Sequence, residues 1–189
     1  MRFLERREFL QQSAGLAGLI AAGYFADEVM SDEQPQTQPQ PNAAGGANER
    51  LNIAVIGVRG RGKDHITGLA GRHNCRVTHI CDVDSAVTGS AAMQIQKAQG
   101  GAAPTVVEDM RRLFDNKDIH AITVATPNHW HSLAGIWAMA AGKHVYVEKP
   151  VSHNIPEGRL LLEAARKHNR VVQVGTQSRS TAHNRRAIE

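Results

Sequence analysis

The chain has 189 residues, a length that allows one domain and additional segments. Its formal charge of +4 comes from scattered lysines and arginines, so solvated surface is the first interpretation and an anionic ligand the alternative. No nucleic-acid motif or long basic run is present, and we expect no nucleic-acid partner. The two cysteines, Cys75 and Cys81, would lie about 20 Å apart on one strand, which argues against an intrachain disulfide.

Residues 1–30 differ in character from the rest of the chain. Arg6-Arg7 is followed by Phe9-Leu10 and by the mildly apolar run 13–26, which is too short and too glycine-rich for a transmembrane helix. This pattern resembles a twin-arginine export signal, although Glu5 stands where serine or threonine is usual. We therefore expect recognition by the twin-arginine export machinery and a periplasmic protein. The alternative is an ordinary amphipathic helix.

No clear cleavage site follows the apolar run, and an uncleaved signal would tether the protein to the membrane. Residues 31–50 are rich in proline, glutamine and glycine and are expected to form a linker without a packed core. The folded domain is expected over residues 51–180.

A glycine turn follows the first apolar segment of that domain. Ile53–Ile56 is typical of a buried strand, three glycines follow (Gly57, Gly60 and Gly62), and Lys63–Arg72 has helical periodicity. Strand, turn and helix in this order direct backbone N–H groups at one point, which suits a phosphate. The pattern departs from G-x-G-x-x-G because Arg59 occupies the second glycine position. A plain tight turn therefore remains an alternative at this stage.

An acidic residue ends the second predicted strand. Asp82 lies 20 residues beyond Gly62, where a dinucleotide site requires a carboxylate that accepts from ribose hydroxyls. The alternative is that Asp82 or Asp84 caps the following helix.

Strands and helices are predicted to alternate along the remainder of the domain. This alternation predicts an α/β fold with a Rossmann-type, doubly wound parallel sheet of about six strands in the order 3-2-1-4-5-6. For the helix 129–141 the inward residues are expected to be Leu133, Ile136, Trp137 and Ala140. The later predicted elements are helices at 84–98, 108–115, 129–141 and 156–168 and strands at 76–82, 104–107, 121–125, 144–147 and 171–174.

Polar loops follow the last three strands, where ligands of open α/β sheets bind. His129 and His131 are two residues apart at a helix start, so we expect them to begin the helix and border a cofactor rather than bind zinc; no metal site is predicted. Lys149 follows the fifth strand and is the best catalytic candidate, since it could position a hydroxyl and exchange a proton. A surface ion pair with Glu148 is the alternative. The Lys149–Pro150 bond could be cis.

Three segments together resemble the N-terminal domain of the glucose–fructose oxidoreductase, inositol dehydrogenase and MocA (Gfo/Idh/MocA) family. They are the glycine turn, the segment Thr126–His131, and the segment Ala141–Pro150, whose Glu-Lys-Pro is the family's most specific motif. The likeness covers Leu51 to about Ser180 and includes the closing Val172–Gln177. Arg59 is its departure within the glycine turn.

The resemblance implies that NAD is the cofactor and that Lys149 is catalytic. Asp82 would hold the adenosine ribose and repel a 2′-phosphate, which favours NAD, whereas Arg59 and Arg61 leave NADP open. The implied cofactor-binding residues are Gly57, Arg59, Gly60, Arg61 and Gly62 at the pyrophosphate, Asp82 at the ribose, Thr126, Pro127, Asn128 and His131 beside the nicotinamide, and Glu148, Lys149, Pro150 and Gln177.

Members of this family continue into a second domain that forms the substrate wall. Residues 181–189 are interpreted as its start, so we expect a fragment of a longer protein and an inactive isolated chain. The implied function is that of the nucleotide-binding domain of an exported oxidoreductase acting on a sugar or polyol hydroxyl, homo-oligomeric when full-length. Two alternatives stay open: an NAD-dependent glycosidase of the same fold, and a truncated dinucleotide-binding chain without catalytic activity.

Overall fold

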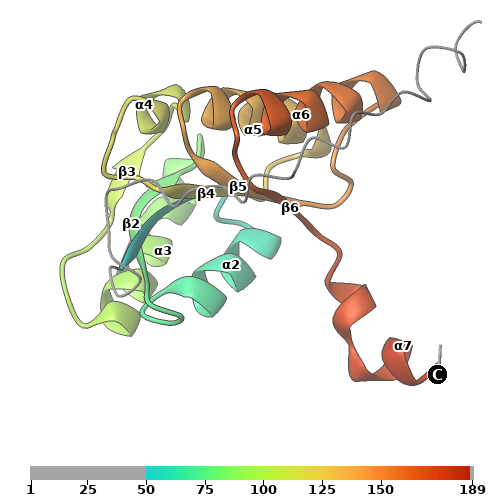
Figure 1. The fold of residues 1–189 in the computed structure, drawn as a ribbon. Coiled ribbons are helices and arrows are strands. Elements are labelled where there is room, and N and C mark those ends of the chain that lie inside the picture. The colour runs from blue at the N-terminus through green and yellow to red at the C-terminus, as the bar shows by residue number, and fades with distance from the viewer. Residues whose placement is uncertain (1–49, 188–189) are drawn as a thin grey trace, which may run out of the picture. The chain divides into compact units, whose positions relative to one another are not determined.

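The computed structural model describes residues 50–187 of the chain, which form a six-stranded parallel sheet flanked by helices (Figure 1). The strand order is β3-β2-β1-β4-β5-β6, as the sequence predicts. The expected export signal and most of the expected linker lie outside the described residues. The strands are β1 (Leu51–Ile56), β2 (Cys75–Cys81), β3 (Thr105–Val107), β4 (Ala121–Val124), β5 (His144–Glu148) and β6 (Val172–Gly175).

Helices cover the sheet on two sides (Figure 1). On one side, α2 (Arg61–Leu69) and α3 (Ser85–Gln99) pack on β1 and β2 around a core that includes Val55, Ile66 and Ile80. On the other side lie α4 (Arg111–Phe114), α5 (His131–Ala140) and α6 (Ile155–Lys167), over a second core. The helices therefore change from one side of the sheet to the other where β1 and β4 lie next to each other. Right-handed crossovers produce this change in a sheet with this strand order. It leaves the carboxyl ends of the strands on one edge of the sheet.

The helix ends follow from local side-chain chemistry. Asp84 caps α3, because its carboxylate accepts a hydrogen bond from the backbone N–H of Ala86, and Gly100 ends the helix with a φ of 62°. Asn154 caps α6 in the same way by accepting from the N–H of Glu157. Capping of α3 is therefore done by Asp84, and Asp82 is available for another role.

The buried face of α5 differs from the prediction. Leu133 is 38% exposed, and Ala140 is exposed as well, although both were expected to point inward. The helix instead buries small residues where it meets the sheet and α6. An added Cβ at Gly135 would lie 2.7 Å from Leu161 of α6, so close helix packing decides the orientation. The buried residues are His131, Ser132, Ala134, Gly135, Ala138 and Met139.

Beyond β6 the described chain forms a short 3-10 helix, η2 (Gln177–Ser180), and then α7 (Ala182–Arg186) (Figure 1). The segment 181–189, interpreted above as the start of a second domain, is thus helical over Ala182–Arg186. Among residues 50–187, no helix has the length and apolar character needed to cross a membrane. Cys75 and Cys81 are both buried free thiols, in agreement with the predicted absence of a disulfide.

Candidate functional site

The glycine turn between β1 and α2 has no room for side chains at two positions. An ideal Cβ at Gly57 would lie 2.7 Å from the carbonyl oxygen of Ala125, and one at Gly62 would lie 1.9 Å from that of Gly57. Gly57 also has a φ of +82°, which L-residues rarely adopt. The turn therefore packs backbone directly on backbone beside the end of β4. Gly60 precedes α2 without a side-chain cap, which leaves this helix N-terminus open to an anion.

Asp82 follows β2 and is fixed against this turn. Its Oδ2 accepts a 2.9 Å hydrogen bond from the N–H of Val58, and its Oδ1 accepts a 3.0 Å bond from the N–H of Asp84. The carboxylate is only half-buried and keeps further lone pairs for a ligand hydroxyl. The predicted ribose-binding geometry and the predicted phosphate turn are thus side by side.

Two ion pairs lie at the same edge. Arg59, in the position of the second glycine, pairs with Asp84 through a guanidinium–carboxylate contact. Hydrogen bonds from the N–H of Ala86 and from Arg59 hold the pKa of Asp84 below its ordinary value. Asp109 pairs with Arg111, whose side-chain and backbone hydrogen bonds lower the pKa of Asp109 to about 2. Both carboxylates are therefore charged at neutral pH.

These residues border a cavity of about 780 Å³ at the carboxyl ends of β1, β2, β3 and β4. Its volume falls in the range of cofactor sites. The hydroxyl of Thr126 is buried at this cavity and has no hydrogen-bond partner within residues 50–187, so it is placed to bond a ligand. The lining is Ile56, Gly57, Arg59, Cys81, Asp82, Val83, Asp84, Glu108, Asp109, Met110, Arg111, Ala125, Thr126, Pro127, Trp130 and Trp137.

Part of this lining is not among the residues predicted from the sequence. Glu108–Arg111 and the indoles of Trp130 and Trp137 were not predicted as site residues. Glu108–Arg111 follows β3, so the rule that ligands lie beyond the carboxyl ends of strands would have indicated it. Trp130 lies in η1 (Asn128–Trp130), next to residues that were predicted.

The thiol of Cys81 also borders the cavity but is expected to be unreactive. Burial, with added repulsion from the Asp82 and Asp109 carboxylates, raises the pKa of Cys81 to about 12. At pH 8 only on the order of one such thiol in ten thousand is ionised, and the thiolate is the reactive form. We expect iodoacetamide to alkylate Cys81 at least about a hundredfold more slowly in the folded chain than in guanidinium chloride, as measured by peptide mass spectrometry. Equal rates in the two states would contradict this assignment.

His131 occupies a different position from the one expected. The residue is 2% exposed and does not line the cavity. Nε2 lies 2.8 Å from the carbonyl oxygen of Thr126, and Nδ1 lies 2.6 Å from that of Pro150. The ring therefore braces the loop after β4 against the loop after β5. The ring, predicted to lie beside the nicotinamide, is turned inward at the start of α5 and does not line the cavity.

His131→Ala is expected to lower the free energy of unfolding by about 2–3 kcal/mol, because the buried imidazole loses its contacts with the carbonyl oxygens of Thr126 and Pro150 and leaves a cavity. The matched control is His129→Ala, since His129 is exposed and two residues away; its change is expected within about 0.5 kcal/mol. Urea denaturation followed by circular dichroism measures both. Equal effects of the two substitutions would contradict the bracing role.

Glu148 and Arg61 are likewise placed away from the cavity. Glu148 is 3% exposed, and its Oε1 lies 3.1 Å from Nε2 of His65 and 3.4 Å from Nε of Arg61. Burial acts to raise the pKa of Glu148, but the His65 and Lys149 N–H hydrogen bonds and the positive charge of Arg61 outweigh it and lower the pKa. Arg61, predicted to contact the pyrophosphate, pairs in this structure with Asp64 and Glu148.

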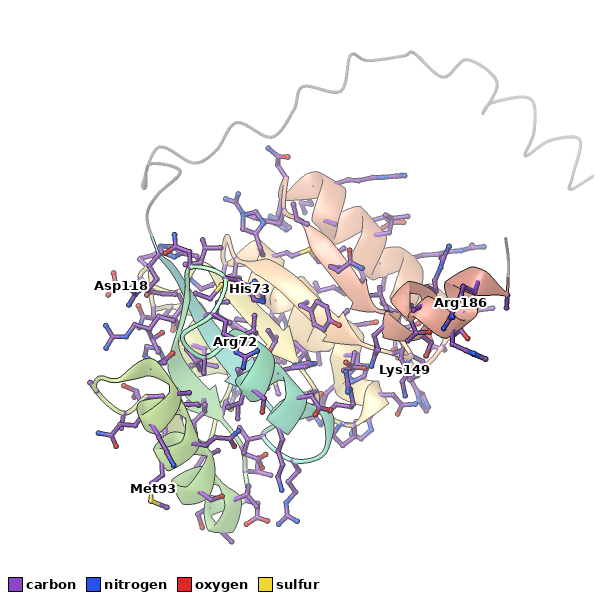
Figure 2. The ribbon with its side chains drawn as sticks, turned by 90° about the horizontal axis from the view of Figure 1, so that it is seen from below. Arg72, His73, Met93, Asp118, Lys149 and Arg186 are labelled. Atoms are coloured by element: carbon purple, nitrogen blue, oxygen red, sulfur yellow. The ribbon has the colours of Figure 1, made fainter. Side chains whose placement is uncertain are left out.

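Lys149 is exposed at the end of β5, on the opposite side of the molecule from Asp118, which precedes β4 (Figure 2). Its ammonium group pairs with no other described residue, so the expected alternative of an ion pair with Glu148 is not observed. The Lys149–Pro150 bond is cis. Asn128 and Pro150 are exposed and Gln177 is half-buried in η2; like Gly60 and Gly62, they lie outside the lining of the cavity.

The described residues contain no cluster of three or more histidine, cysteine or acidic side chains suited to a metal ion. The tightly packed glycine turn, the carboxylate of Asp82 and the hydroxyl of Thr126, which has no partner among residues 50–187, together suit a dinucleotide. The turn would suit a phosphate, the Asp82 carboxylate a ribose, and the Thr126 hydroxyl a further polar group.

Comparisons with known proteins agree with this geometry. The chain is 30% identical over 173 residues to a "Glycosyl hydrolase family 109 protein" of Shewanella sp. (strain W3-18-1), covering 87% of this chain and 38% of that protein. The structure is similar to myo-inositol 2-dehydrogenase from Lactobacillus plantarum, with a TM-score of 0.64, 25% identity, and coverage of 74% of this chain and 40% of that chain. It is equally similar, at 26% identity with the same TM-score and coverage, to scyllo-inositol dehydrogenase from Lactobacillus casei with bound NAD(H) and scyllo-inositol.

The chain thus spans about two-fifths of the length of these relatives. The family model described as "Oxidoreductase family, NAD-binding Rossmann fold" matches residues 51–176, which is more than half of the chain. The chain therefore belongs to the Gfo/Idh/MocA oxidoreductase family, of which it contains the NAD-binding Rossmann domain.

Proposed function

We propose that this protein is the cofactor-binding part of an NAD-dependent oxidoreductase that acts on a hydroxyl group of a sugar or polyol. The observation that carries the proposal is the position of Asp82, whose carboxylate is hydrogen-bonded to Val58 of the glycine turn at a cavity of about 780 Å³. The similarity to an inositol dehydrogenase structure with bound NAD(H) and scyllo-inositol supports the substrate class.

The residues of the cavity have separate roles toward the cofactor. The glycine turn would accept the pyrophosphate, since it leads into α2, whose N-terminus has no side-chain cap. Asp82 would accept the ribose hydroxyls and repel a 2′-phosphate, so NAD is expected to bind more tightly than NADP. When bound, the nicotinamide supplies the hydride chemistry.

Lys149 would act on the substrate. Its exposed ammonium group has no partner among the described residues and is carried by a strand end, which holds it in place. It would donate a hydrogen bond to the reacting hydroxyl and hold or release the proton of that hydroxyl at Nζ.

A glycosidase is the second candidate, because the chain is 30% identical to a glycosyl hydrolase family 109 protein. The roles of the glycine turn and Asp82 would be the same in such an enzyme. The substrate would differ, and no net NADH would be formed.

Incubation of the chain with NAD and a panel of inositols and sugars, and separately with nitrophenyl glycosides, tests these functions. Accumulation of NADH supports the oxidoreductase, and sugar release without net NADH supports the glycosidase. Binding of NADH without any turnover indicates a dinucleotide-binding chain that needs further protein for catalysis. Failure of the folded chain to bind NADH would overturn the proposal.

We also propose that the protein is exported by the twin-arginine route and is periplasmic. Support comes from Arg6-Arg7, the following Phe9-Leu10 and the mild apolar run 13–26. Fusion of residues 1–50 to a fluorescent reporter that must fold before export tests it. Periplasmic fluorescence is expected, and the paired substitution Arg6→Lys, Arg7→Lys should abolish it; unchanged export of that variant would contradict the route.

A further inference from the structure

We propose that His65 is a positioning residue that holds the Glu148 carboxylate and thereby fixes Lys149 relative to the glycine turn. The proposal rests on the proposed function, because it concerns the placement of the proposed catalytic lysine. His65 lies on α2, the helix that begins at the glycine turn, and Glu148 is the last residue of β5. The two residues are 83 positions apart in sequence.

The contact between these two side chains is buried on both sides. The His65 side chain is 5% exposed and the Glu148 side chain is 4% exposed, with 3.1 Å between Nε2 and Oε1. Tyr146, two residues earlier on the same face of β5, packs its ring edge-to-face against His65 at 5.2 Å and 87°. The imidazole is thus held by two contacts, both with β5.

The hydrogen bond assigns the proton on His65. An ionised carboxylate only accepts, so Nε2 must be the donor in this contact. Nδ1 is buried without a partner in the described part of the chain, which the neutral tautomer tolerates because that nitrogen then carries only a lone pair. The side chain therefore has one directed interaction, and it is with Glu148.

Glu148 passes this restraint to Lys149. Its second oxygen, Oε2, lies 3.3 Å from the backbone N–H of Lys149. β6 leaves room for the carboxylate only because Gly175 stands opposite: an added Cβ there would lie 2.9 Å from Oε1. With 3% exposure, Glu148 is too enclosed to touch a cofactor or substrate itself. Glu148 therefore acts on the site indirectly, by fixing the direction of the backbone at Lys149.

The arrangement connects two parts of the site. Gly62, at the start of α2, packs on the backbone of Gly57, and one turn further on His65 reaches β5. Arg61 of the same helix contacts the same carboxylate oxygen at 3.4 Å. One helix therefore sets the distance between the phosphate turn and Lys149. Misplacement of a catalytic group by about 1 Å is enough to cost about a hundredfold in rate.

Chemical labelling of Lys149 tests the proposal without requiring turnover. The chain is treated with a trace of an acetylating ester with and without NADH, and acetylation of each lysine is followed by peptide mass spectrometry. In the unmodified chain NADH should slow Lys149 acetylation by about tenfold. In His65→Ala this protection should fall below about twofold, whereas the NADH dissociation constant and the acetylation of Lys97 stay within about twofold of the unmodified chain.

Two further variants separate positioning from loss of structure. His65→Gln keeps a donor for Glu148 and should restore part of the protection, and Glu148→Gln, which is isosteric and uncharged, should lose protection as His65→Ala does. Thr67→Ala, an exposed change on the same helix, is the control. Full NADH protection of Lys149 in His65→Ala or Glu148→Gln would overturn the proposal, as would NADH binding to the unmodified chain that leaves Lys149 unprotected. Absence of NADH binding by the unmodified chain would instead overturn the proposed function, and this proposal with it.

Discussion

Gly62→Ala is expected to lower the free energy of unfolding by about 3 kcal/mol or more and to abolish measurable NADH binding. The added Cβ would stand 1.9 Å from the carbonyl oxygen of Gly57, far inside van der Waals contact. The atom that the Cβ would meet belongs to the backbone of Gly57, so no side chain can rotate away to make room. The start of α2 must therefore separate from the end of β1. A loss of this size is a large part of the 5–15 kcal/mol that stabilises a typical domain.

Gly68→Ala is the matched control, since it lies in the same helix, is exposed and has nothing within 4 Å of an added Cβ. Alanine is a better helix former than glycine, so this variant should gain about 1 kcal/mol. Thermal unfolding and NADH titration of the two variants side by side measure the contrast. A Gly62→Ala chain with the stability and NADH affinity of the unmodified chain would show that the glycine turn is not packed as described.

Asp82→Ala is expected to weaken NADH binding by about thirtyfold or more. Hydrogen bonds to a charged group are each worth about 1.5–3 kcal/mol, and 1.4 kcal/mol corresponds to a tenfold change in affinity. The substitution also leaves the N–H groups of Val58 and Asp84 without their acceptor, which loosens the turn. Asp82→Asn keeps the shape and one acceptor oxygen, so it should retain more NADH affinity and narrow the preference for NADH over NADPH.

Asp109→Asn controls for the loss of a negative charge in the same cavity. Asp109 borders the cavity but pairs with Arg111 rather than with the glycine turn. The NADH dissociation constant of the Asp109→Asn variant is expected to stay within about twofold of that of the unmodified chain. Nicotinamide fluorescence measures the NADH dissociation constants of all these variants. Equal weakening by Asp109→Asn and Asp82→Asn would mean that net charge, not the position of Asp82, governs binding.

The strand order followed from the sequence because each strand is a short apolar run bounded by turn residues, and handedness rules leave few topologies. The orientation of α5 did not, because apolar residues surround most of that helix. Leu133 fits the periodicity as well as Ala134 does, and only the approach of Leu161 to Gly135 decides which side is buried. Packing between distant helices is not encoded in local periodicity.

In the candidate site, too, local features could be predicted from the sequence and contacts between distant elements could not. The tight packing at Gly57 and Gly62 and the position of Asp82 beside the turn could be predicted, because they depend on backbone conformation and on spacing within one strand–helix–strand unit. The inward positions of His131 and Glu148 could not be predicted, since their partners belong to other elements. The His65–Glu148 contact joins residues 83 positions apart and leaves no pattern along the chain.

Titration of the ¹⁵N-labelled chain with NADH, followed by backbone amide NMR, tests the central claim most directly. The account predicts that the largest shifts occur at Val58 and Gly60 of the glycine turn and at Asp82, Asp84 and Thr126, which line the cavity of about 780 Å³. A second cavity of about 470 Å³, which includes Arg50, Asn74 and Arg76, is a basic alternative for an anionic ligand. Shifts confined to that second cavity, or no shifts at all in a folded chain, would contradict the assignment of the glycine turn and Asp82 as the NAD site.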